Sequence, residues 1–155
     1  MYVFGHGSAG YLLMLLFLPL STYNLTFIIP VLFLSVLPDT DLWLKYLFPK
    51  LKHRTLTHSI YGIIPFILIG ISIFIILGHF TNIYINIYTL IVFLFFLWLQ
   101  HIILDMVYGK VELFKGKRIG LGTEIFDRNN LCLGRLDMIL GFIFLSIAWI
   151  IGVFM

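Results

Sequence analysis

The segment Leu37-Pro38-Asp39-Thr40-Asp41 ends one apolar run of the sequence, and His53-Arg54-Thr55-Leu56-Thr57-His58-Ser59 directly precedes the next. The connection between the two runs therefore carries two carboxylates and two imidazoles in an otherwise apolar chain. Oxygen and nitrogen ligands at this density are typical of a site for a hard or borderline divalent cation. The stretch predicts half of a metal site, and an ordinary polar loop between two membrane helices is the alternative.

The composition indicates an integral membrane protein. Of the 155 residues, 61% are hydrophobic and 11% are charged, and the mean hydropathy is +1.09, whereas soluble domains contain roughly 45–50% apolar residues. A chain of this length accommodates four to five apolar segments of roughly 20 residues each. We therefore expect a single domain over residues 1–155, an all-α integral membrane bundle with four to five transmembrane or re-entrant segments.

Five apolar runs give the expected helices. Pro19 and the polar group at 21–24 divide the first run, so a hairpin of two short helices is expected there. Aromatic and aliphatic residues at 43–48 predict a short helix lying in the membrane interface. The expected membrane helices span residues 3–19, 25–37, 60–78, 87–107 and 138–155.

The distribution of basic residues predicts the topology. All ten Lys and Arg residues lie in the connections 38–59 and 108–137, and the links 21–24 and 78–86 contain none. The positive-inside rule therefore places both basic connections, and with them the N-terminus, in the cytoplasm. We expect a multi-pass protein of the cell membrane.

This topology brings the polar residues of three separate segments to the cytoplasmic face. The helix at 87–107 delivers His101 and Asp105 near its inner end, on one helix face because they are four residues apart. A hydrogen-bonded pair that merely joins helices is the alternative for these two. His79 falls on the opposite side. The predicted metal ligands are His6, Asp39, Asp41, His53, His58, His101 and Asp105.

Four imidazoles and three carboxylates exceed the ligand set of one four-coordinate zinc ion, and they suit two or three ions with open positions for water. Zinc is the first expectation for the metal, with manganese or magnesium as alternatives. The single cysteine, Cys132, has no partner for a disulfide or a thiolate site, so no role is assigned to it.

The order of these motifs resembles a known family. His6, Leu-Pro-Asp-x-Asp at 37–41, His-Arg-x-x-Thr-His-Ser at 53–59 and His-x-x-x-Asp at 101–105 are similar to motifs of the membrane-bound metal-dependent hydrolases, some of which are labelled LexA-regulated. The resemblance covers roughly residues 1–110. It implies a small helical membrane protein with a divalent metal site and a distant likeness to zinc-dependent phospholipase C. Family members often carry a Thr and a Gly soon after the final Asp.

This sequence departs from that pattern after Asp105, since Tyr108 and Gly109 follow Val107 and the Thr is missing. The departure leaves the ligands intact and removes a neighbouring hydroxyl contact.

The residues themselves suggest a hydrolytic reaction. A metal lowers the pKa of bound water toward neutrality, and a second ion can stabilise the oxygens of a phosphoester. Asp39 or Asp41 is predicted to bridge ions, and a remaining carboxylate or histidine to act as general acid or base, so Asp39 and Asp41 are candidate catalytic residues. Arg54 is predicted to clamp a phosphate. Arg54 as a headgroup-binding or topology-setting charge is the alternative.

The predicted position at the membrane surface favours a phospholipid or another lipid-linked phosphoester as substrate, and membrane lipids as the partners. Nucleic acid is not expected, because the basic residues are explained by topology. Two other classes remain open. A metal or proton transporter would hold its ligands near the midplane of the membrane, and a non-catalytic protein would use a closed, fully protein-ligated metal to tie its helices together.

Overall fold

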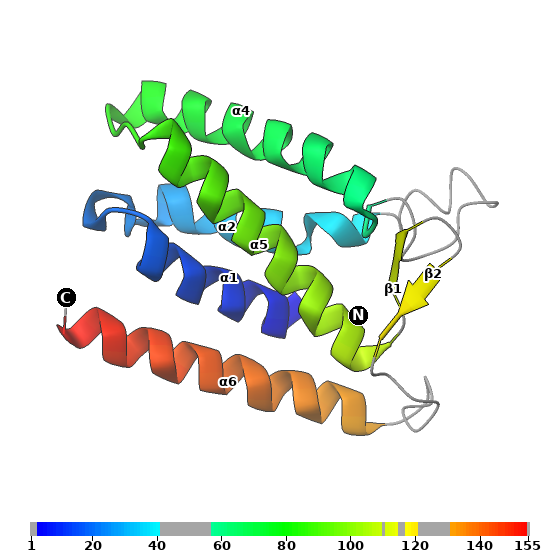
Figure 1. Ribbon diagram of the computed structural model, residues 1–155. Helices are drawn as coiled ribbons and strands as arrows, with labels where there is room; N and C mark the ends of the chain where they lie inside the picture. The colour runs from blue at the N-terminus through cyan, green and yellow to red at the C-terminus, as the bar shows by residue number, and fades with distance from the viewer. Residues whose placement is uncertain (1–2, 41–56, 110, 115–116, 121–130, 155) are drawn as a thin grey trace.

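The structure of the protein is a computed structural model that describes residues 3–40, 57–109, 111–114, 117–120 and 131–154. Within these residues the chain forms a bundle of five α-helices with a small antiparallel hairpin at one end (Figure 1). The predicted all-α bundle of membrane-like helices is therefore confirmed. The α-helices are α1 (Val3–Phe17), α2 (Leu25–Val36), α4 (Ile63–Thr81), α5 (Ile87–Tyr108) and α6 (Leu131–Phe154).

The first two helices form the hairpin that the sequence predicts. The 3-10 turn η1 (Leu20–Thr22) reverses the chain between α1 and α2. The Tyr23 hydroxyl donates a hydrogen bond of 2.6 Å to the Leu15 carbonyl and thereby ties the turn to the end of α1. Helix α1 packs against α2, α5 and α6, which places it inside the bundle (Figure 1).

The helices α4 and α5 form a second hairpin whose turn is specified by two asparagines. Asn82 ends α4 in the left-handed conformation, with φ of 55°, which asparagine tolerates better than most residues. Asn86 begins α5, and its side-chain oxygen accepts from the backbone N–H of Tyr88 at 2.9 Å. The core lies where α5 meets α1, α2 and α4, with Phe93 and Leu97 fully buried.

The outer surface of the bundle is apolar. Ile64, Leu68 and Ile75 of α4 are exposed, at 65%, 59% and 61%, although continuous apolar surface of this kind is unfavourable in water. The segments Ile60–Thr81 and Ile87–Val107 are long and apolar enough to cross a membrane. Shorter apolar stretches in the described part of the chain are Phe4–Phe17, Leu25–Thr40 and Met138–Ile151. These helix faces are therefore suited to contact with the hydrocarbon chains of a lipid bilayer.

The expectation of a loop from 108 to 137 is wrong at both of its ends. Strands β1 (Val111–Phe114) and β2 (Lys117–Ile119) pair antiparallel there. Helix α6 begins at Leu131 instead of at 138, because a charged residue near the end of a membrane helix does not by itself end the helix. The predicted interfacial helix at 43–48 lies outside the described residues.

The two ends of the bundle differ in the segments that they collect. The start of α1, the end of α2, the start of α4, the end of α5 and the β1–β2 hairpin lie at one end (Figure 1). The α1–α2 and α4–α5 turns lie at the opposite end. The segments that flank the basic connections are thus neighbours in space.

Candidate metal centre

Five polar side chains from four segments meet at the end of the bundle that holds the start of α1. His6 comes from α1, Asp39 from the 3-10 turn η2 (Leu37–Thr40), and His58 from the turn before the 3-10 helix η3 (Ile60–Gly62). His101 and Asp105 come from one face of α5. Each of the five residues is at most 2% exposed. Ionisable groups buried at this depth require partners or a bound ion.

The distances between the ligand atoms are those of a compact metal site. Nε2 of His58 lies 2.9 Å from Oδ2 of Asp105 and 3.3 Å from Nε2 of His101. Both imidazole nitrogens lie 3.5 Å from an oxygen of Asp39. Ligands at about 2.1 Å from a tetrahedral zinc ion are roughly 3.4 Å apart. One ligand atom from each of these four residues lies within 4.8 Å of the others, so the cluster fits a divalent cation.

A backbone carbonyl fixes the orientation of His101. Its Nδ1 lies 2.7 Å from the carbonyl oxygen of Ser35. Because a carbonyl only accepts, Nδ1 carries the proton, and in the neutral ring Nε2 presents a lone pair to the cluster. A ligating histidine is commonly held by such a bond from its other nitrogen.

A hydroxyl holds His58 in a comparable way. The Thr57 Oγ1 and the His58 Nδ1 are hydrogen-bonded at 3.0 Å, which leaves Nε2 directed at Asp105 and His101. The backbone of Thr57 is itself tethered, since the Trp98 indole N–H donates to its carbonyl at 3.4 Å. Thr57 thus links the approach to α4 with α5.

His6 extends the four-residue cluster on one side. Its ring stacks on that of His101, with the ring centres 4.1 Å apart and the planes inclined by 17°. Its Nε2 lies 3.4 Å from Oδ1 of Asp105, the oxygen opposite to the one that faces His58. Asp105 therefore lies between two imidazoles, and His6 is placed to bind the same ion, to bind a second one, or to orient Asp105.

The charge balance of the cluster also favours a cation. Neither oxygen of Asp39 has a hydrogen-bond partner among the described residues, and the same holds for Nδ1 of His6. If the imidazoles are neutral, as in a metal site, the two buried carboxylates carry a charge of about −2, which is costly in an apolar bundle. A divalent cation neutralises this charge and ligates the oxygens of Asp39.

The structure brings together five of the seven ligands that the sequence predicts. The other two, Asp41 and His53, and the predicted catalytic Arg54, lie outside the described residues. His79 is exposed near the end of α4, at the opposite end of the bundle. His79 is thus separated from the five along the bundle, and its place on the other side of the membrane stays a prediction.

Ser35 and Trp98 contribute to the site without having been predicted. The contribution of Ser35 is a main-chain oxygen, which carries no signature in the sequence. Trp98 lies three residues before His101, on a neighbouring turn of the same helix. A buried indole N–H usually has a hydrogen-bond partner, so Trp98 could have been predicted to contact a segment near the site.

The fold and this cluster define a helical membrane protein with a buried histidine and aspartate centre suited to a divalent cation. A model of the YdjM inner membrane protein family matches residues 1–153, and the chain belongs to this family. The predicted membrane location is thereby confirmed. No curated protein and no solved structure matches the chain. The family description gives a membrane location and no reaction, so it does not establish the hydrolase family expected from the motifs.

Proposed function

We propose that the protein is a metal-dependent hydrolase that cleaves a phospholipid or another lipid-linked phosphoester. The observation that carries this proposal is the convergence of two carboxylates and two imidazoles within 4.8 Å of one another, with a third imidazole beside them. A polar contact that only joined two helices would need a single histidine–aspartate pair. This set offers more nitrogen and oxygen ligands than helix association requires.

Each residue has a role that follows from its position. Asp39, His58, His101 and Asp105 would hold the cation, and zinc suits this nitrogen and oxygen set best, with manganese or magnesium as alternatives. A divalent cation held there supplies Lewis-acid chemistry and activates water at neutral pH. Ser35 and Thr57 orient the two imidazoles. His6 contacts Asp105 and is placed to accept or return a proton.

The predicted roles of Asp41 and Arg54 continue those of the described residues. Asp41 follows Asp39 by two positions and would supply a further carboxylate to a second ion. Arg54 precedes His58 by four positions and would bind the phosphate through its planar set of donors. Both roles rest on the sequence motifs.

The position of the centre favours a substrate presented by the bilayer. The centre lies at the end of the bundle where the segments flanking both basic connections meet (Figure 1). Basic residues near the membrane attract anionic headgroups, and the positive-inside rule assigns this face to the cytoplasm in a multi-pass arrangement. A centre at one end also disfavours a metal or proton transporter, whose ligands belong near the midplane.

A non-catalytic centre is the second candidate, because all five side chains are almost fully buried. A metal that only ties helices together is fully ligated by protein and exchanges no water. In that case, loss of the metal would destabilise the bundle and no lipid would be cleaved.

Hydrolysis in vesicles distinguishes the two candidates. The metal-loaded protein is reconstituted with phosphatidic acid, phosphatidylglycerol or a polyprenyl phosphate ester, and the products are measured by mass spectrometry. We expect product from at least one lipid, reduced by about 100-fold or more in Asp39→Asn, since general acid-base and metal contributions are of this size. The variant His79→Asn is the matched control. Absence of product from every lipid class, with the metal fully bound, would favour the non-catalytic centre.

A further inference from the structure

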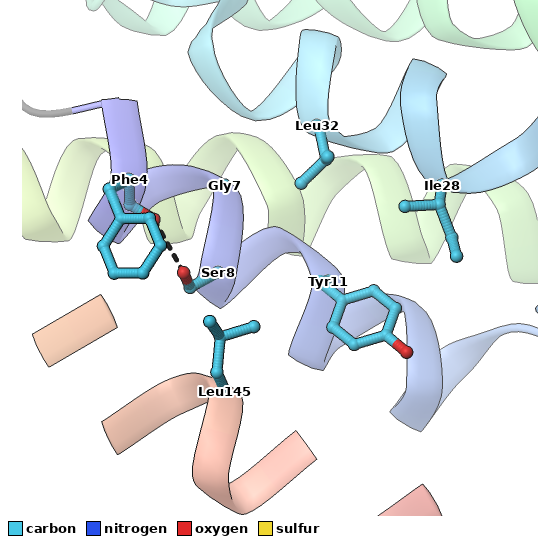
Figure 2. Close-up of a pocket in the computed structure, with 7 residues that line it drawn as sticks. All are labelled: Phe4, Gly7, Ser8, Tyr11, Ile28, Leu32 and Leu145. Carbon is cyan, nitrogen blue, oxygen red and sulfur yellow. Dashed lines mark hydrogen bonds between the residues drawn. The ribbon is translucent and has the colours of Figure 1, made fainter. Parts of the chain in front are cut away.

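A groove of about 420 Å³ lies between α1, α2 and α6 (Figure 2). Its floor is one face of α1, formed by Phe4, Gly7, Ser8 and Tyr11, which are spaced by three and four residues. Helix α2 contributes one wall and Leu145 of α6 stands opposite (Figure 2). This volume is in the range of ligand sites, roughly 300–1,000 Å³.

The lining of the groove presents hydrocarbon. The Ser8 hydroxyl donates to the Phe4 carbonyl at 2.7 Å within α1, as the dashed line in Figure 2 shows, so it requires no ligand. No charged residue lines the groove in the described part of the chain. Gly7 leaves space between α1 and α2, because a Cβ at this position would come within 3.3 Å of Leu32. Tyr11 adds one hydroxyl to the lining, and apart from Ser8 the other lining residues are apolar. A phosphate headgroup would find no cationic partner here.

We propose that this groove binds one acyl chain of a membrane lipid. The rim residues Phe4 and Leu32 are 40% and 39% exposed, and Ile29 and Phe33 continue the same apolar surface on α2, so the groove opens onto the lipid-facing side of the bundle. One turn of a helix about 10 Å in diameter occupies roughly 400 Å³. The groove would hold only a single turn of a partner helix, whereas an extended chain fits along it.

The groove begins at the end of the bundle that holds the metal centre. His6, a member of the centre, lies between Phe4 and Gly7 in the sequence, but at 3.6 residues per turn it projects from the opposite face of α1, toward His101 of α5. From Phe4 to Tyr11 the groove runs along two turns of α1, roughly 10 Å. Resting on the proposed hydrolase function, the bound chain is the tail of the substrate, and a headgroup beyond the Phe4 end of the groove would lie at the end of the bundle that holds the centre.

Photolabelling tests chain binding separately from catalysis. The full-length protein is placed in lipid nanodiscs that contain phosphatidylglycerol with a diazirine midway along one acyl chain, and labelled peptides are mapped by mass spectrometry. The substitution Leu32→Trp fills the groove, and Ile29→Trp is its control on the lipid-facing side of the same helix. A second pair on α6 is Leu145→Trp and Ile143→Trp, since only Leu145 lines the groove. Metal content is measured in every sample.

We expect label on the groove residues of α1 and α2 in excess of that on the outward face of α4. Leu32→Trp or Leu145→Trp should reduce it by about tenfold, which corresponds to about 1.4 kcal/mol of binding free energy, while Ile29→Trp and Ile143→Trp leave it unchanged. Equal labelling of the groove and of α4, or labelling that survives both groove variants, would overturn the proposal. Lost labelling with retained metal and no hydrolysis of any lipid would uphold the chain site and contradict the hydrolase function instead.

Discussion

Nε2 of His58 lies 3.3 Å from Nε2 of His101, although 43 positions separate the two residues in the chain. Nδ1 of His101 donates its proton to the Ser35 carbonyl. When the ring is neutral, Nε2 of His101 therefore carries a lone pair that faces His58. Two imidazole nitrogens and two carboxylates that share one small volume repel one another unless a proton or a cation lies between them. The contact therefore joins α5 to the segment before α4, and it creates a position that a proton or a cation can fill.

Removal of the Thr57 hydroxyl should weaken metal binding without removing a ligand. In Thr57→Val the bond to His58 Nδ1 is lost, and the imidazole is free to rotate away from Asp105. Loss of such an orienting partner commonly costs about 10–100-fold in metal affinity. Competition with a zinc-selective chelator measures the change. Thr57→Ser, which retains the hydroxyl, should stay near the wild-type affinity, and equal losses in both variants would contradict this role.

A methyl group at Gly10 should disturb the centre through Ser35. A Cβ at position 10 would collide with the Ser35 side chain, whose carbonyl holds His101. We expect Gly10→Ala to cost about 1–3 kcal/mol of stability, as overpacking usually does, and to reduce metal affinity as well. Gly70→Ala is the matched control, because a Cβ there meets Leu94, away from the centre. Gly70→Ala should lower the thermal midpoint while leaving chelator competition unchanged.

His6 should contribute to metal binding even though it lies at the edge of the cluster. Its Nε2 contacts Asp105, and its ring covers that of His101. We expect His6→Ala to lower metal affinity by roughly tenfold or more, in line with an orienting or an additional ligand. His79→Ala, at the far end of the bundle, should bind metal as the wild type does. A His6→Ala protein with unchanged metal stoichiometry and affinity would show that His6 only packs there.

Cysteine labelling should place the centre on the cytoplasmic face. In a Cys132→Ala background, Tyr84→Cys lies in the α4–α5 turn and Lys117→Cys lies in the β1–β2 hairpin, at opposite ends of the bundle (Figure 1). The positive-inside rule predicts that an impermeant maleimide labels Tyr84→Cys on intact cells and Lys117→Cys only after permeabilisation. The reverse pattern would place the centre outside.

The helices could be predicted from the sequence because a bilayer leaves few alternatives for a long apolar run. Pro19 and the polar group after it were sufficient to separate α1 from α2. The start of α6 is not evident from the sequence, because Arg135 and Asp137 interrupt the apolar run, although helix ends at an interface tolerate charge. The β1–β2 hairpin carried a weak signal, a Lys-Gly pair between two short strands that contain charged residues.

The convergence of the centre could be anticipated from the basic residues, because they fix which connections share an end of the bundle. The detailed geometry of the centre could not be predicted from the sequence. The Ser35 carbonyl acts through the main chain, and the stacking of His6 on His101 depends on how α1 is rotated against α5. The groove beside α1 depends on the packing of α6, which no residue pattern specifies.

Metal content tests the central claim most directly. The detergent-purified protein, prepared without chelator and offered zinc, manganese and magnesium, is measured by inductively coupled plasma mass spectrometry beside Asp39→Asn, His58→Ala and the control His79→Ala. We expect near-stoichiometric divalent metal in the wild type and the control, and a large loss in the two centre variants while they remain folded. A wild type that stays metal-free under these conditions, or centre variants that bind as much metal as the control, would contradict the account.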